Sequence, residues 1–121
     1  MKWPNWTVMS LANLDVDEET QQCIDNCQTA VQVTEHCADQ CLDEDGDMTE
    51  CIRLCRDVTE IASTHVRLMA RDSAYSGEIA SVCADVCEAC ADECEKHDHD
   101  HCQACAEALR DCVETCRQMA A

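Results

Sequence analysis

The sequence is poor in the residues that build β-structure and turns. It contains no phenylalanine, one proline and two glycines, and its aromatic side chains are Trp3, Trp6 and Tyr75. A β-sandwich or barrel needs aromatic and β-branched strands separated by frequent turn residues, so both are excluded. Alanine, glutamate, glutamine, arginine, leucine, methionine and valine dominate instead. Because most of these residues favour helices, we expect an all-α chain.

Basic residues are also scarce, with 8 lysines and arginines against 26 acidic residues and a formal net charge of −18. Such a surface repels nucleic acid and anionic membranes, so we expect neither as a partner. The acidity favours a halophilic host, where concentrated salt screens the repulsion between like charges.

Long apolar runs are absent as well. No run approaches the roughly 20 residues that span a bilayer. Residues 1–10 lack the apolar core, the twin arginine and the small-residue cleavage site of an export signal. The sequence therefore predicts a cytoplasmic protein in a reducing compartment, with a single domain over residues 1–121.

What is abundant is cysteine, with 14 residues, and it follows helical spacing. Three polar segments, 43–47, 71–77 and 96–101, divide the chain. They predict helices over 16–43, 48–71, 76–96 and 99–119, with a short extra helix over 5–13 lying on the bundle. Short connections favour antiparallel neighbours, so the predicted fold is an up-down-up-down four-helix bundle.

The cysteines recur in alternating steps of three and four, which keeps one face of each helix toward its partners. This inner seam holds the positions that leucine or isoleucine would normally fill. The remaining apolar residues, such as Leu54, Ile61 and Val82, lie beside the seam, where we expect them to pack between helices or subunits. The seam cysteines are Cys23, Cys27, Cys37, Cys41, Cys51, Cys55, Cys83, Cys87, Cys90, Cys94, Cys102, Cys105, Cys112 and Cys116.

Antiparallel helices sort these cysteines into two zones. One zone lies near the 43–47 and 96–101 segments and gathers Cys37, Cys41, Cys51, Cys55, Cys90, Cys94, Cys102 and Cys105. The other gathers Cys23, Cys27, Cys83, Cys87, Cys112 and Cys116, together with His65 and Met69, which continue the seam of the second helix.

Other roles for these cysteines fit the sequence less well. As plain core residues they would leave the interior underpacked. Disulfides within a helix have the wrong geometry, and a reducing compartment opposes disulfides between helices. Cys87-x2-Cys90 and Cys102-x2-Cys105 have the spacing of a zinc ribbon, but the sequence between them is helical. Zinc or general soft-metal sequestration and a thiol-disulfide redox protein remain the alternatives. The redox function would use Cys102 and Cys105.

Cu(I) fits the seam best. This soft ion prefers thiolate, thioether and imidazole ligands and accepts two or three of them, so adjacent thiols can share many ions. Each Cys-x3-Cys pair places two sulfurs on one face, one helical turn apart. Thiol deprotonation supplies the negative charge that offsets the incoming cations. Many similar sites along one core suit storage better than catalysis.

The repeated Cys-x3-Cys pairs on four predicted helices resemble the copper storage proteins over residues 16–119. The resemblance implies a bundle filled with multiple Cu(I)-thiolate sites and assembled as a homotetramer, in the cytosolic branch of the family. It also implies histidine and methionine ligands that admit copper at an open end, here the end of the 43–47 and 96–101 segments. His101, Met48 and His97 are candidates for that role, whereas His36 and His99 are expected on the surface.

The predicted function is therefore the storage of Cu(I) by core thiolates, with His65 and Met69 as further ligands. No catalytic constellation is evident, so we do not expect an enzyme. The implied partners are copper ions and a protein that donates or accepts copper.

Overall fold

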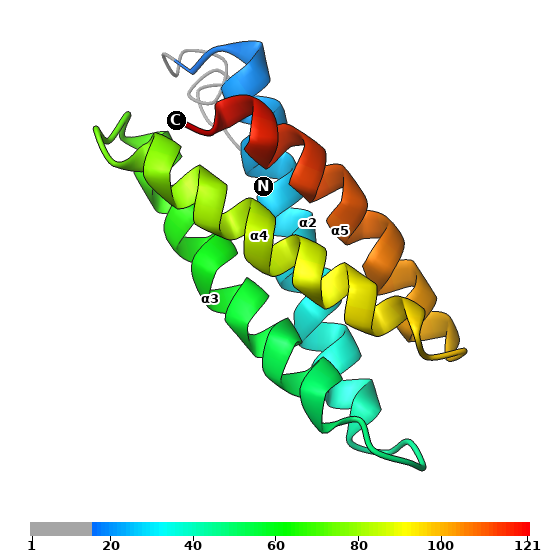
Figure 1. Ribbon diagram of the computed structural model, residues 1–121. Helices are drawn as coiled ribbons and strands as arrows, with labels where there is room; N and C mark the ends of the chain where they lie inside the picture. Colours follow the sequence, from blue (N-terminus) through cyan, green and yellow to red (C-terminus); the bar gives the residue numbers. More distant parts are fainter. Residues whose placement is uncertain (1–15) are drawn as a thin grey trace, which may run out of the picture.

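A computed structural model describes residues 16–121, and the short helix expected over 5–13 lies outside this range. The described residues form four helices, and each runs antiparallel to the two beside it (Figure 1). The 42–48 and 96–99 connections lie at the opposite end from the C-terminus. Helix α2 packs against α3 and α5, and α4 packs against the same two. The predicted up-down-up-down bundle is confirmed. The helices are α2 Glu18–Cys41, α3 Thr49–Ala70, α4 Ser76–Glu95 and α5 Asp100–Met119.

The start of α2 shows how local chemistry sets the helix bounds. Asp17 is the residue before the helix, and its carboxylate accepts a hydrogen bond of 2.7 Å from the backbone N–H of Thr20. Glu18 and Glu19 occupy the first turn, where negative charge faces the positive end of the helix dipole. The connection that follows α2 contains Gly46 with φ of +91°, a left-handed conformation that glycine adopts without strain.

Two of the polar segments overlap the helices predicted beside them, and the structure assigns both overlaps to the helices. Gly77, which lies in the 71–77 segment and in the predicted helix over 76–96, is part of the first turn of α4. The position needs a small residue, because a Cβ there would lie 2.9 Å from the Cβ of Ala121, whose N–H bonds the Gly77 carbonyl. His101, which lies in the 96–101 segment and in the predicted helix over 99–119, is part of the first turn of α5, which begins at Asp100.

The core lies along the bundle axis and consists mainly of cysteine and alanine, with few larger side chains. Leu109, His65, Val58 and Thr34 are the largest of the fully buried side chains. Within residues 16–121, no helix has an apolar stretch of the length and character that a bilayer crossing requires.

Two arginines of α5 fasten it to α4 on the outside of the bundle. Arg110 contacts Asp92 at 2.7 Å and Glu95 at 2.9 Å. One heptad later, Arg117 contacts Asp85 and Glu88, each at 2.9 Å. These pairs are solvent-exposed, so each contributes modestly to stability.

Candidate metal-binding core

All 14 cysteines point into the bundle, and none of them is more than 2% exposed. The structure gathers them at the two ends of the core, as the sequence predicted. We call the set made of Cys37, Cys41, Cys51, Cys55, Cys90, Cys94, Cys102 and Cys105 the loop-end cluster. The set made of Cys23, Cys27, Cys83, Cys87, Cys112 and Cys116 is the termini-end cluster.

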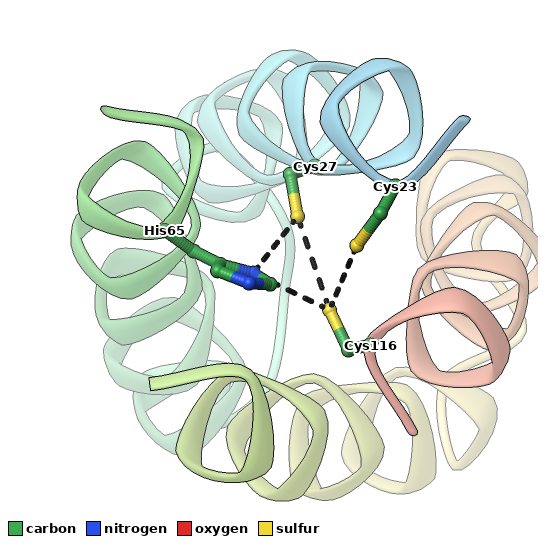
Figure 2. A group of neighbouring side chains, drawn as sticks. All are labelled: Cys23, Cys27, His65 and Cys116. Atoms are coloured by element: carbon green, nitrogen blue, oxygen red, sulfur yellow. Dashed lines mark hydrogen bonds between the residues drawn. The ribbon is translucent and has the colours of Figure 1, made fainter. Parts of the chain in front are cut away.

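The termini-end cluster joins three helices around His65. Figure 2 shows Cys23 and Cys27 of α2, His65 of α3 and Cys116 of α5 converging on the bundle axis. The Cys116 sulfur lies 3.9 Å from the sulfurs of both Cys23 and Cys27. His65 Nδ1 is 3.5 Å from the Cys27 sulfur and 3.7 Å from that of Cys116. A thiolate and imidazole set of this kind suits a soft metal ion.

The loop-end cluster brings sulfurs together from all four helices. Cys41 of α2 and Cys51 of α3 approach to 3.8 Å, and Cys51 lies 3.7 Å from Cys94 of α4. Cys37 lies 3.9 Å from Cys102 of α5. The chain therefore places thiols from distant segments within reach of a common ion.

The potential ligand sets overlap. In each of four sets, all the ligand atoms lie within 4.8 Å of one another. Cys27 and Cys116 belong to two sets at the termini end, and Cys37 belongs to two at the loop end. Shared sulfurs are suited to bridging between ions. The sets are Cys23–Cys27–His65–Cys116, Cys27–Cys83–Cys112–Cys116, Cys37–Cys41–Cys51–Cys102 and Cys37–Cys55–Cys94–Cys105.

Hydrogen bonds between sulfurs distribute the thiol protons unevenly. At Cys112, bonds from Cys116 and then Cys27 stabilise the thiolate and lower its pKa to about 5. At Cys27, the bond to Cys112 and then that to Cys116 raise the pKa above its ordinary value. In the loop-end cluster, the bond with Cys105 likewise lowers the pKa of Cys94. Each cluster thus pairs thiols that ionise readily with neighbours that keep their protons.

His65 is completely buried, in the position on α3 where the cysteine seam is interrupted. Burial lowers its pKa, but the hydrogen bond with Cys83 and the nearby sulfur charges outweigh that effect and raise it. Its Nε2 is buried and has no hydrogen-bond partner among the described residues. Met69 follows one turn later and is 4% exposed, which places it at the same end of the core.

At the loop end, His101 lies between the cysteines and the surface. Its Nδ1 is 3.4 Å from the Cys37 sulfur and 3.5 Å from that of Cys102, while its Nε2 contacts Glu44 at 3.2 Å. Burial lowers the pKa of His101, but Cys37 and then Glu44 raise it by more. Met48 is also buried, immediately before α3.

His99 and Glu44 were missed as candidate ligands. His99, expected on the surface, lies half-buried with its ring stacked on that of His101 at 5.4 Å, and its Nδ1 contacts Glu44 at 3.2 Å. The ligand atoms of Glu44, His99 and His101 all lie within 4.8 Å of one another. Helical periodicity gives no signal for this group, because Glu44 and His99 lie in connections. His97, just after the end of α4, instead forms a hydrogen bond of 2.9 Å with Glu93 of that helix.

The geometry argues against the two alternatives built on Cys-x2-Cys. Cys102 and Cys105 are fully buried. Burial, and then the charges of neighbouring sulfurs, raise the pKa of Cys102. The pKa of Cys105 is also raised, mainly by its hydrogen bond with Cys37. A thiol-disulfide carrier needs an accessible thiol of lowered pKa. Cys87 and Cys90 lie within α4, so they do not form the turn of a zinc ribbon.

Comparison with known proteins agrees with this geometry. A family model described as copper storage protein matches residues 16–121. The uncharacterized cysteine-rich protein YhjQ of Bacillus subtilis is 44% identical over 108 residues, covering 88% of this chain and all of that protein.

Two solved structures extend the comparison. The Cu(I)-bound copper storage protein BsCsp3 is 45% identical with a TM-score of 0.81, over 86% of this chain and 100% of that one. A cytosolic copper storage protein from Streptomyces lividans, in a structure with five coppers, is 35% identical with a TM-score of 0.80, over 84% and 92%. The inward thiols, the bundle and these matches together show that the chain belongs to the copper storage protein family.

Proposed function

We propose that the 14 buried cysteines of this copper storage protein hold multiple Cu(I) ions as thiolate clusters at both ends of the core. His65 and Met69 complete the ligands at the termini end. The observation that carries the proposal is the overlap of the ligand sets, because Cys27, Cys37 and Cys116 each serve two sets. Cu(I) thiolate clusters are built by sulfurs that bridge neighbouring ions.

The same overlap favours Cu(I) over isolated structural zinc sites. A structural Zn(II) site is closed by four ligands in a tetrahedron, and isolated sites of this type do not share sulfurs. Cu(I) binds two or three soft ligands, so a mesh of sulfurs 3.7–4.0 Å apart offers it many equivalent positions. Zinc sequestration remains the second candidate, and competition between the two metals separates them.

Copper is proposed to enter at the loop end. His101 contacts the cluster on one ring nitrogen and surface-facing Glu44 on the other. A groove of about 520 Å3 on this side is lined by His36, His101 and Cys105, among others. The family resemblance adds Met48 and His97 as further ligands on the route. Of these, Met48 is buried and His97 is bonded to Glu93.

The remaining expectations concern the setting of the protein. The proposed state is a cytoplasmic homotetramer without enzymatic activity, which exchanges copper with a donor or acceptor protein. A strip on α3 and α4 that includes half-buried Ile61 and Val86 and exposed Val82 supports contacts between subunits. The net charge of −18 supports a halophilic host and argues against partners of nucleic acid or membrane. The Streptomyces lividans relative is itself cytosolic.

The test is an anaerobic Cu(I) titration of reduced protein against a chromogenic chelator. We expect the protein to withhold copper on the order of one ion per cysteine. Saturation at one or two ions, or displacement of Cu(I) by equimolar Zn(II), would show that storage is wrong. Two double variants that each remove two thiols serve as a matched comparison, Cys27→Ser/Cys37→Ser and Cys23→Ser/Cys41→Ser. The Cys27→Ser/Cys37→Ser variant should lose more copper capacity, because each of its two sulfurs is shared between ligand sets.

A further inference from the structure

The thiol core is interrupted halfway along the bundle by an apolar layer. Thr34 of α2, Val58 of α3 and Leu109 of α5 are fully buried and occupy the seam between the two clusters. Ala30 and Ala62 complete the layer, which we call the waist. Thr34 is no metal ligand here, because its hydroxyl bonds the Ala30 carbonyl at 2.7 Å and the Thr59 hydroxyl at 2.9 Å.

The contacts between sulfurs respect this division. At the termini end they join Cys27 to Cys112 at 3.7 Å and Cys87 to Cys112 at 3.9 Å. At the loop end they join Cys55 to Cys90 at 3.7 Å and Cys90 to Cys94 at 4.0 Å. Each ligand set also falls entirely on one side of the waist. The store is therefore two clusters rather than one continuous column.

Helix α4 is the exception to the interruption. On α2, α3 and α5 the waist residues separate the cysteines of one cluster from those of the other, but on α4 Cys87 is followed by Cys90 with no apolar seam residue between them. Residues three apart lie on the same helical face. Cys87 contacts the termini-end cluster through Cys112, and Cys90 contacts the loop-end cluster through Cys55.

We propose that the waist splits the copper store into two separately filling parts, and that Cu(I) crosses it by transfer from Cys90 to Cys87. The inference rests on the proposed storage of Cu(I). In the transfer, the Cys87 thiol gives up its proton and its sulfur bonds the ion. The bond from copper to the Cys90 sulfur then breaks, and that sulfur takes up a proton. Copper stays Cu(I) throughout, so no oxidant or reductant is needed.

A consequence is that filling should proceed in two phases. The loop-end cluster loads first, because His101 connects it to the surface. The termini-end cluster loads later, because every ion must pass one pair of sulfurs. The test is anaerobic loading with limiting Cu(I), followed by a short pulse of alkylating agent in denaturant and by peptide mass spectrometry. The denaturant exposes the buried thiols, so the labelling reports which of them copper protects at each time. Protection of Cys37 and Cys51 should precede that of Cys27 and Cys116.

Two pairs of variants test the transfer route. Cys87→Ser/Cys90→Ser should slow protection of the remaining termini-end thiols by about tenfold. Cys23→Ser/Cys41→Ser removes the same number of thiols, but neither of them flanks the waist, so it should slow this protection less. Leu109→Cys places a soft ligand in the waist and should bring the two phases together. Leu109→Ser removes the same apolar bulk without supplying that ligand, and should leave them separate.

The outcomes separate this inference from the proposed function. Simultaneous protection of both clusters in the wild-type chain overturns the two-part store, even where total capacity stays near one ion per cysteine. Equal acceleration by Leu109→Cys and Leu109→Ser also overturns the transfer by ligand exchange, because bulk alone would then control passage. A total capacity of one or two ions instead overturns storage itself. The wild-type time course does not depend on whether any variant folds.

Discussion

His65 combines a structural penalty with a chemical use. Its Nε2 is buried without a hydrogen-bond partner among the described residues, and such a group costs about 1–3 kcal/mol of folding free energy. Its Nδ1 lies against the sulfurs of Cys27 and Cys116. A side chain that destabilises the core and contacts candidate metal ligands is explained by the proposed metal binding rather than by packing.

Replacing His65 by leucine should therefore move stability and copper binding in opposite directions. In the metal-free, reduced protein, His65→Leu should raise the free energy of unfolding by about 1 kcal/mol, because the unpartnered nitrogen is removed. Cu(I) affinity of the termini-end cluster should fall. Chemical denaturation and chelator competition measure the two effects. His36→Leu, at an exposed position, is the control and should change neither.

At the residue scale, the positions of the cysteines were predictable, whereas the group formed by Glu44, His99 and His101 was not. Alternating steps of three and four predict which face of a helix is buried, and every cysteine obeys that rule. His99 lies immediately before α5 in extended conformation, and Glu44 lies in the turn after α2. Their approach depends on how two connections fold together, which no periodic pattern records.

At the scale of the helix, the cap of α2 gives a pH dependence with a definite sign. Hydrogen bonds from Thr20 lower the pKa of Asp17 below the ordinary 3.8. A carboxyl whose pKa is lowered by folding stabilises the folded state above its unfolded pKa. That stabilisation is lost as the pH falls through the folded-state value.

Asp17→Ala should consequently lower the thermal midpoint at neutral pH, and the difference from wild type should vanish below the folded-state pKa of Asp17. Thermal unfolding from pH 7 to pH 2.5 measures this difference. Asp17→Asn keeps a side-chain acceptor without the titrating charge, so the difference in thermal midpoint between Asp17→Asn and Asp17→Ala should vary less with pH. A wild-type minus alanine difference that is constant across the range would contradict the cap.

The helices themselves were predicted to within about two residues because their ends carry local signals. Polar segments interrupt the seam at each connection, and two of them contain a glycine. Gly77 gives a mixed signal, because glycine usually marks a turn but the predicted helix over 76–96 includes it. In the structure its small size serves the contact with Ala121, a residue far away in the sequence. Such a tertiary reason for a glycine cannot be read from its neighbours.

Across the whole molecule, repulsion outweighs the visible ion pairs. The charge of −18 is spread over the surface, whereas Arg110 and Arg117 offset it at four acidic residues. Salt screens repulsive and attractive surface pairs alike, so its net effect follows the larger of the two. Here that effect is relief of repulsion.

The thermal midpoint of the reduced protein should therefore rise when KCl is increased from about 0.05 M to about 1 M, because this salt shortens the electrostatic screening length to roughly 3 Å. Differential scanning calorimetry at constant pH measures the midpoint. Sucrose at matched osmolality controls for preferential exclusion. A midpoint that falls with KCl would mean that the arginine contacts outweigh the general repulsion.

Leu109 has a further consequence for how the chain finds its alignment. Cys83 and Cys90 on α4 are seven residues apart, and so are Cys105 and Cys112 on α5. Sliding α5 by one heptad along α4 would again bring sulfur against sulfur, so the thiols alone do not define the register. Leu109 breaks the repeat, because the slide would move its bulk out of the waist and into a cluster of small side chains. The short 96–99 connection opposes the same slip. The residue that divides the core thus also marks the one alignment in which the helices fit.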